Sequence, residues 1–340
     1  MYLLELAGED DRFAAAEAAS AATDVEVVAP GVATASAVEP DRVAGLAYTR
    51  RASELLGRTE ADVEGARSLL EAVEFDRTGT VAVRARDVRG TAKIDTQAAE
   101  RALGRALVDR GFAVDLEAPN HELRAVFAGE TCVLGWLAVE GERGFGSRMP
   151  SDKPFFQPGS MDPLEARAVA NLARARPGAT FVDPMCGTGG ILVEAGLVGA
   201  RVVGFDAQRK MVRGARKNLE RYLGEGAETA GSTPAGFDVG LADAARLPIR
   251  DGGVAAVVVD VPYGRQSKVA STDVDSLVGA AFREARRVAD RAVVVADRSR
   301  ESEAIGAGWT VEAVFERPVH RSLTRYVHVL DGGAVEAGGG

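Results

Sequence analysis

From Pro163 onward, short apolar runs of strand length alternate with longer segments of helical spacing, and this alternation constrains the fold most. The expected strands are TFVDP, RVVGFD, DVGLAD, VAAVVVD and RAVVVAD. The expected helices are LEARAVANLARA, GILVEAGLV, QRKMVRGARKNLERYL and VDSLVGAAFREARRVA. Strands that follow crossover helices run parallel, so residues 163–331 are predicted to form an α/β fold with a doubly wound sheet. The runs TVEAVFE and TRYVHVL predict a closing pair of strands.

The first part of the chain has an α+β character, with short strands mixed among helices. We expect an N-terminal α+β segment over residues 1–50 and a second α+β domain over 51–145. DTQAAERALGRALVDRGF predicts an amphipathic helix that Asp95 or Thr96 caps and Gly111 ends. Residues 146–162 are rich in Gly, Ser and Pro and are expected to be a linker, and residues 332–340 a disordered tail.

Composition limits the classes of function. The net charge of −9 argues against a general nucleic-acid binder, because phosphates are neutralised by Lys and Arg. The basic residues are mostly arginine. If the acidity reflects adaptation to salt, local arginine patches matter more for nucleic-acid binding than the net charge of the whole chain. Two cysteines provide neither a disulfide framework nor a metal cluster, so no metal is expected. Without a basic leader or a long apolar run, we expect a cytoplasmic protein with no membrane contact.

A glycine-rich loop follows the first strand of the second part, in TFVDPMCGTGGILVEAG. A Walker loop is excluded because no Gly-Lys-Ser/Thr ends it. A dinucleotide fingerprint begins at Gly187 and Gly189, but its last glycine is replaced by Leu192. The S-adenosylmethionine loop of Rossmann-like methyltransferases fits better, because Asp183 supplies an acid for the ligand's ammonium group. The alternative is a tight turn with incidental glycines.

Further aspartates follow at the expected ends of successive strands. Asp206 lies about 20 residues after Asp183, where an acid binds a ribose diol. Asp243, with Ala244 beside it, is expected at the end of the third strand, within reach of an adenine amino group. Asp260 is expected at the end of the fourth strand. Because open α/β sheets bind ligands at this edge, we interpret these residues as cofactor-binding rather than as helix caps.

The stretch DVPYGRQSK suggests chemistry on an exocyclic amine. Such a nitrogen is a poor nucleophile because its lone pair is delocalised into the ring. The carboxylate of Asp260 and the backbone carbonyl of Val261, next to Pro262, offer two acceptors for the N–H bonds. Tyr263 offers a flat face on which a flipped base can stack. We therefore predict that Asp260, Val261, Pro262 and Tyr263 form the catalytic turn.

This turn resembles the D/N-P-P-Y/F motif of amino-directed methyltransferases, with Val261 in place of the first proline. The whole chain resembles the archaeal tRNA guanine-10 N2-methyltransferases, which combine a THUMP domain with a Rossmann-like class I methyltransferase domain. The segments that carry the resemblance are PFFQPGSMDPLEARAVANLA, DPMCGTGGILVEA, VVGFDAQRKMVRGARKNL, DVPYGRQSK and HRSLTRYVHVL. The resemblance implies S-adenosylmethionine as cofactor and mono- or dimethylation of a guanine N2 amine in tRNA. It also implies an RNA-binding THUMP fold in residues 51–145.

Several basic residues flank these motifs. Those expected to bind RNA are Arg143, Arg148, Lys153, Arg265, Lys268 and Arg321. The alternative for each is a solvated surface position. At the level of function, the alternatives are a ribosomal RNA guanine-N2 or DNA amino methyltransferase, and a non-catalytic RNA-binding protein on the same scaffold. We expect a monomer.

Overall fold

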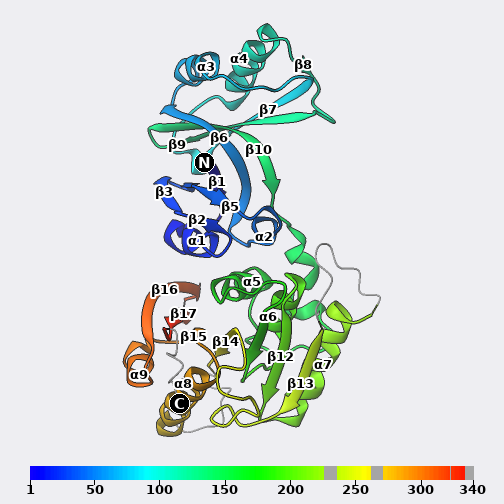
Figure 1. Cartoon of the computed structure of the whole chain (residues 1–340), viewed down its shortest axis with the longest axis vertical. Coiled ribbons are helices and arrows are strands. Elements are labelled where there is room, and N and C mark those ends of the chain that lie inside the picture. The colour runs from blue at the N-terminus through cyan, green and yellow to red at the C-terminus, as the bar shows by residue number, and fades with distance from the viewer. Residues whose placement is uncertain (226–235, 262–270, 322, 334–340) are drawn as a thin grey trace, which may run out of the picture. The chain divides into compact units, whose positions relative to one another are not determined.

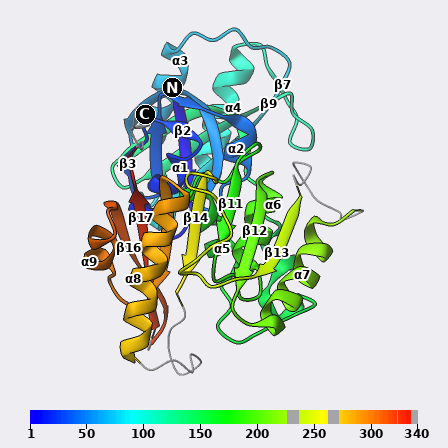
Figure 2. The same ribbon diagram turned by 60° about the horizontal axis from the view of Figure 1, so that its bottom comes forward.

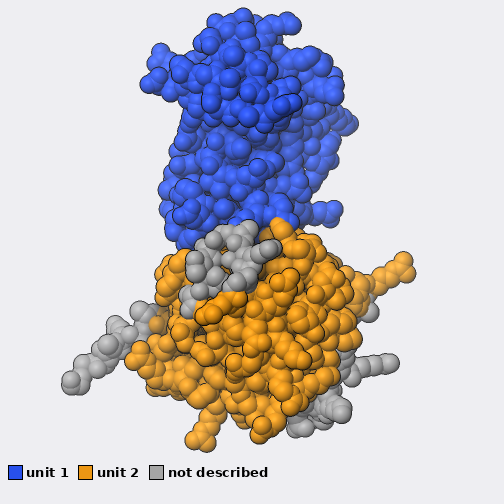
Figure 3. All heavy atoms as spheres, turned by 90° about the vertical axis from the view of Figure 1, so that its right-hand side faces the viewer, with its two compact units in different colours: residues 1–143 blue, residues 144–340 orange. Residues whose placement is uncertain are grey.

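A computed structural model describes the chain except for residues 226–235, 262–270, 322 and 334–340. The chain divides into two compact units, residues 1–143 and residues 144–340 (Figure 3). None of the described helices has the length and apolarity needed to cross a membrane. Each unit has its own sheet, and each is described here by itself.

The second unit is built on a seven-stranded sheet of order β13-β12-β11-β14-β15-β17-β16 (Figure 1). The strands are β11 (Thr180–Asp183), β12 (Arg201–Asp206), β13 (Phe237–Leu241), β14 (Ala256–Asp260), β15 (Arg291–Ala296), β16 (Thr310–His320) and β17 (Leu323–Asp331). Strands β11 to β15 pair in parallel, whereas β17 is antiparallel to both β15 and β16. The predicted doubly wound parallel sheet with a closing strand pair is confirmed.

Helices cover both faces of this sheet (Figure 2). They are α5 (Pro163–Leu172), α6 (Gly190–Leu197), α7 (Arg209–Leu223), α8 (Ser271–Val288) and α9 (Glu301–Gly306). Helix α6 packs between α5 and α7. The crossovers through α6 and α8 lead in opposite directions along the sheet, so their right-handedness places these helices on opposite faces. The core beneath α8 includes Val257, Phe282 and Trp309.

The order of the strands fixes where a ligand can bind. Strand β11 pairs with β12 on one side and with β14 on the other, in the register Val182↔Val257. The chain leaves β11 toward β12 and returns to β14, so the strand order reverses at this point. Ligands of open α/β sheets bind in the crevice at the carboxyl ends of such strands. Asp183, Asp206 and Asp260 each end one of these three strands.

The segment that leads into α5 belongs to the second unit, although the sequence indicated a linker over residues 146–162. It contains two short 3₁₀ helices, η2 (Gly144–Arg148) and η3 (Pro150–Asp152). The backbone of Phe155 is held on both sides by Asn218 of α7, with N···O distances of 2.8 Å. The Phe155 ring lies where Gly214 leaves space, since a Cβ there would come within 2.0 Å of the ring. The segment is therefore packed onto α7.

The first unit contains an eight-stranded sheet of order β3-β4-β1-β6-β10-β9-β7-β8, and a two-stranded sheet of β2 and β5. The strands are β1 (Tyr2–Leu6), β2 (Ala22–Thr23), β3 (Glu26–Ala29), β4 (Val32–Ala35), β5 (Ala37–Val38), β6 (Thr49–Glu60), β7 (Thr80–Asp87), β8 (Ala113–Val114), β9 (His121–Ala128) and β10 (Thr131–Glu140). Because β1 pairs with both β4 and β6, residues 1–50 and the residues that follow share one sheet.

Four α-helices and one 3₁₀ helix accompany this sheet: α1 (Asp11–Ala18), α2 (Pro40–Ala44), α3 (Val63–Ala72), η1 (Val88–Gly90) and α4 (Thr96–Asp109). Helix α4 begins as expected, because the Asp95 side chain accepts a hydrogen bond from the backbone N–H of Ala98 at 3.0 Å. Helices α3 and α4 pack on an apolar core that includes Leu103, Phe127 and Trp136. The α+β character predicted for this part of the chain is confirmed.

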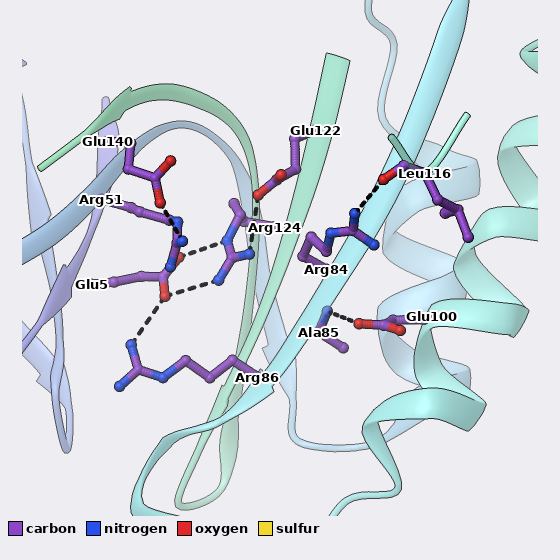
Figure 4. Close-up of polar contacts among 10 residues, drawn as sticks. All are labelled: Glu5, Arg51, Arg84, Ala85, Arg86, Glu100, Leu116, Glu122, Arg124 and Glu140. Carbon is purple, nitrogen blue, oxygen red and sulfur yellow. Dashed lines mark hydrogen bonds and ion pairs between the residues drawn. The ribbon is translucent and has the colours of Figure 1, made fainter. Parts of the chain in front are cut away.

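The opposite face of the same strands carries charged side chains (Figure 4). Glu5 is fully buried there, and its carboxylate accepts hydrogen bonds from Arg124 at 2.7 and 3.0 Å and from Arg86 at 3.2 Å. Burial alone would raise the pKa of Glu5, but the hydrogen bonds and charges of Arg124 and Arg86 hold it below its usual value. Two arginines are thereby held on one face of the sheet by the Glu5 carboxylate, and Arg124 also donates to Glu122 at 3.1 Å.

Candidate active site

The glycine-rich loop between β11 and α6 has the backbone shape of a ligand cradle. Gly187 and Gly189 have φ angles of 53° and 76°, a region that residues with a Cβ seldom adopt. Gly189 also faces α7, where a Cβ would come within 3.3 Å of the Ala215 Cβ. The loop ends at the N-terminus of α6, whose first N–H groups have no partner within the helix. Such an arrangement lets a ligand approach the backbone closely.

Asp206 holds this loop from the end of β12. Its Oδ2 atom accepts a hydrogen bond from the Gly187 N–H at 3.1 Å, and its Oδ1 atom accepts one from the Gln208 N–H at 2.8 Å. Burial raises the pKa of Asp206, and these two hydrogen bonds oppose the rise. The position expected for a ribose-binding acid is therefore occupied by a carboxylate that also fixes the loop.

Asp183 lies near two further carboxylates at this edge of the sheet. Burial raises the pKa of Asp183 well above its usual value, and the nearby charges of Asp260 and Asp206 raise it further. A hydrogen bond from the Met185 N–H at 3.0 Å works in the opposite direction. Carboxylates gathered in this way are relieved by a cation, so the site favours a positively charged ligand.

Asp260 differs from Asp183 and Asp206 in its hydrogen bonding. Burial raises its pKa to about 6, and the charge of Arg325 opposes that shift. Its Oδ1 atom is buried and, among the described residues, has no hydrogen-bond partner. Val261 is also buried, and its N–H donates to the Val295 carbonyl at 2.9 Å, which fixes the chain directly after the aspartate. A buried carboxylate oxygen without a partner is costly, so a donor supplied by a ligand would be stabilising.

The other predicted residues of this turn, Pro262 and Tyr263, lie outside the described residues, as do Arg265 and Lys268.

Asp243 differs from its expected position. Strand β13 ends at Leu241, so Asp243 does not end the strand but lies in the turn that follows. There it accepts a hydrogen bond from the Ala245 N–H at 2.9 Å and forms an isolated bridge with Arg246. The prediction that it ends the third strand was wrong, because aspartate also favours turns that its own side chain closes. Ala244 beside it is buried.

Sequence reasoning missed a set of polar residues behind the loop. The hydroxyl groups of Ser160 and Thr188 lie 3.2 Å apart, joining the segment before α5 to the glycine-rich loop. Asn218 of α7 donates to the Thr188 carbonyl at 2.9 Å while also holding Phe155. The signal was weak, since an asparagine within a polar helix and a serine in a Gly/Pro-rich stretch are common.

The basic residues expected to bind RNA have different surroundings. Arg143 donates to the carbonyls of Ala47 and Thr49 at 3.0 and 3.1 Å. Arg148 forms a bidentate pair with the buried Glu194, at 2.8 and 3.1 Å. Lys153 is only 6% exposed, so it is not the surface residue that the sequence indicated.

Arg321 is exposed, at the turn between β16 and β17. Of the expected RNA-binding residues that the structure describes, Arg143 and Arg321 are exposed, and Arg143 already donates to two backbone carbonyls.

The doubly wound sheet, the glycine loop and the acids at the switch point define a Rossmann-like methyltransferase domain. A profile of the family described as "RMKL-like, methyltransferase domain" matches residues 150–327. The chain is 35% identical over 293 residues to the "tRNA (guanine(10)-N2)-dimethyltransferase" of Methanothermobacter thermautotrophicus, covering 84% of this chain and 83% of that protein. It is 31% identical over 286 residues to the protein of the same name from Pyrococcus abyssi, covering 82% of each.

The chain therefore belongs to the family of tRNA (guanine(10)-N2)-dimethyltransferases. It is also similar to the crystal structure of TrmN from Thermus thermophilus, with a TM-score of 0.49, 24% identity, and coverage of 97% of this chain and 99% of that chain. The cofactor of this enzyme class is S-adenosylmethionine.

The site fits this cofactor on its own chemistry. S-adenosylmethionine carries a sulfonium and an ammonium group, and the charges of Asp206 and Asp260 near Asp183 favour such cations. The positive φ angles of Gly187 and Gly189 leave the backbone open to close approach.

Proposed function

We propose that this protein transfers methyl groups from S-adenosylmethionine to the exocyclic N2 amine of a guanine in tRNA. The observation that carries the proposal is the Oδ1 atom of Asp260 at the end of β14, which is buried and has no hydrogen-bond partner among the residues that the structure describes. The family relationship supports guanine 10 as the position, because the relatives from two organisms are named for that nucleotide. Their names also support dimethylation rather than a single transfer.

In the proposed mechanism, the bound cofactor supplies an electrophilic methyl group. Asp260 and the backbone carbonyl of Val261 accept the two N–H bonds of the guanine amine, so that its lone pair points toward the methyl carbon. Methyl transfer to the nitrogen would leave S-adenosylhomocysteine as the second product, and the proton lost from the amine would pass to water. With a pKa of about 6, Asp260 is ionised at neutral pH and stabilises the positive charge that develops on the amine. Tyr263 stacks on the flipped base.

For the RNA we propose a contact surface in the first unit, which we interpret as the THUMP-like, RNA-binding part of the chain. Arg86 remains one quarter exposed while its guanidinium pairs with Glu5. Arg84 lies on the same face of β7 and donates to the Leu116 carbonyl at 2.8 Å (Figure 4). Arginines fixed in this way can bind phosphates with little loss of side-chain freedom. We further propose that the protein is a cytoplasmic monomer.

The proposal is tested with an unmodified tRNA transcript and labelled S-adenosylmethionine, followed by nucleoside analysis. The expected products are N2-methylguanosine and N2,N2-dimethylguanosine. A matched transcript with inosine at position 10 lacks only the N2 amine and should accept no label. Asp260→Ala should lose turnover yet bind cofactor and tRNA normally. Equal labelling of the inosine transcript would refute the assignment to guanine 10.

Label in ribosomal RNA or DNA but not in tRNA would retain the amine chemistry and refute the substrate. Full activity of Asp260→Ala would refute the proposed role of the carboxylate.

A further inference from the structure

Lys153 is a buried cation whose role neither the fold nor the proposed mechanism explains. It lies directly after η3 and is 6% exposed. Its Nζ atom is buried and has no hydrogen-bond partner in the part of the chain that the structure describes. Burial lowers the pKa of Lys153, while the charges of Glu194 and Asp162 oppose that shift. A buried ammonium without a partner costs free energy, so a reason for its retention is needed.

Glu194, whose charge raises the pKa of Lys153 most, already has other hydrogen-bond partners. Glu194 of α6 is fully buried, and Arg148 bonds both of its oxygens at 2.8 and 3.1 Å. Arg167 of α5 reaches the same carboxylate at 2.9 Å. Asp162 uses one oxygen to cap α5, accepting from the Leu164 N–H at 2.8 Å. Both acids therefore have hydrogen-bond partners other than Lys153.

The ammonium lies at the ligand-binding edge of the sheet. An ideal Cβ on Gly190 would be only 3.4 Å from the Lys153 Nζ atom, so the cation is adjacent to the first residue of α6. The free N–H groups at this helix N-terminus also favour an anion. The paired hydroxyls of Ser160 and Thr188 belong to the two segments that flank it, the approach to α5 and the cofactor loop. The Ser160 hydroxyl already donates to the Gln157 carbonyl at 2.8 Å, so the ammonium and the helix N–H groups are the donors that describe a site for one small anion.

We propose that Lys153 and the N-terminus of α6 bind the α-carboxylate of the methionine part of S-adenosylmethionine. The proposal rests on the use of this cofactor and assigns Lys153 to cofactor binding instead of RNA binding. The carboxylate accepts hydrogen bonds from the ammonium and from loop N–H groups, and thereby supplies the partner that the described residues do not offer to Lys153. The aspartates at the strand ends attract the cations of the same ligand, the sulfonium and the ammonium that shares its carbon with the carboxylate. Anion and cations of one molecule are thus matched by groups of opposite charge.

The test compares two ligands that differ only in this carboxylate. S-adenosylmethionine and its decarboxylated analogue are titrated calorimetrically into the wild-type protein and into Lys153→Met. The variant should bind S-adenosylmethionine about 10- to 100-fold more weakly, the range expected for loss of a charge-assisted hydrogen bond. Its affinity for the decarboxylated analogue should change less than about threefold. Lys217→Met, which removes an exposed lysine on α7, is the matched control and should leave both affinities unchanged.

A second measurement needs no substitution. With ¹³C-labelled lysine, the NMR signal of one buried lysine should shift on binding S-adenosylhomocysteine but not on binding 5′-methylthioadenosine, which lacks the amino acid part. Equal weakening of both cofactor analogues by Lys153→Met would overturn the inference, as would weaker tRNA binding with cofactor affinity intact. If the variant does not fold, absence of the carboxylate-specific shift in the wild-type protein overturns it. Failure of the wild-type protein to bind S-adenosylmethionine would instead refute the proposed function.

Discussion

The Asp206 carboxylate and the Gly187 N–H are joined by a hydrogen bond of 3.1 Å, which ties the end of β12 to the cofactor loop. The second oxygen of Asp206 accepts from the Gln208 N–H, so both oxygens face donors. Asparagine at this position would turn an amide NH₂ toward one of these donors. We expect Asp206→Asn to weaken S-adenosylhomocysteine binding about tenfold, measured by calorimetry. Asp238→Asn, an exposed position on β13, should have no effect, and an unchanged affinity in Asp206→Asn would contradict the assignment.

The raised pKa of Asp260, whose Oδ1 atom is buried, predicts an acid limb in the pH dependence of kcat/KM. With its pKa raised to about 6, the carboxyl group becomes protonated as the pH falls below 6, and it then no longer accepts from the amine. Activity should therefore rise with pH up to about 6 and level off above it. Since the charge of Arg325 lowers this pKa, Arg325→Met should move the inflection to higher pH. A limb unchanged in position by that substitution would show that another group titrates.

The raised pKa of Asp260 affects stability in the opposite direction to activity, since it favours the folded protein at low pH. A carboxyl group whose pKa is raised by folding stabilises the protein below its unfolded pKa, and this contribution is lost as the pH rises through about 6. Asp260→Asn should therefore raise the free energy of unfolding at pH 8 but not at pH 4. The measurement is chemical denaturation at the two pH values. A loss of stability at one residue, as expected for Asp260, is typical of residues that are retained for function.

The sheet and the aspartates at its strand ends could be predicted from the sequence, because both follow local patterns. Alternating strands and helices predict the parallel sheet, and an aspartate at a strand end is visible in the strand itself, as for Asp183 and Asp260. Asp243 shows the limit, because the same residue type also closes a turn two residues beyond its strand. Contacts between distant segments, such as that of Asn218 with Phe155, leave no periodic signal.

The burial of Lys153 could not be predicted from the sequence, because it too depends on contacts between distant segments. A lysine in a Gly/Ser/Pro-rich stretch is typical of an exposed linker, and only its packing near α6 shows otherwise. The first unit gives a further example. Pairing of β1 with β6 joins the beginning of the chain to the following domain, and register between strands far apart in sequence depends on tertiary packing.

Asn218 connects three parts of the site, and its removal should affect both stability and binding. Its side chain bonds the N–H and carbonyl of Phe155 and the carbonyl of Thr188 while fully buried. Asn218→Ala leaves these backbone groups without their partner, so we expect unfolding of the second unit to cost about 2–3 kcal/mol less. Denaturation followed by fluorescence of Trp309 measures this. Lys217→Ala, the exposed neighbour on the same helix, should change the free energy of unfolding by less than about 0.5 kcal/mol.

Glu5 offers the corresponding test in the first unit. Its carboxylate is fully buried and pairs with Arg124 and Arg86, so Glu5→Gln leaves the buried Arg124 with Glu122 as its remaining ion-pair partner. We expect a loss of about 3–5 kcal/mol in the free energy of unfolding of this unit and weaker tRNA binding, with cofactor affinity unchanged. Because the pKa of Glu5 is lowered by folding, the wild-type contribution is present at neutral pH and is lost as the pH falls through the folded value. Glu60→Gln, an exposed change on β6, is the control. Loss of cofactor binding in Glu5→Gln, with the second unit folded, would show that the carboxylate acts on the methyltransferase site rather than on the arginine-bearing face alone.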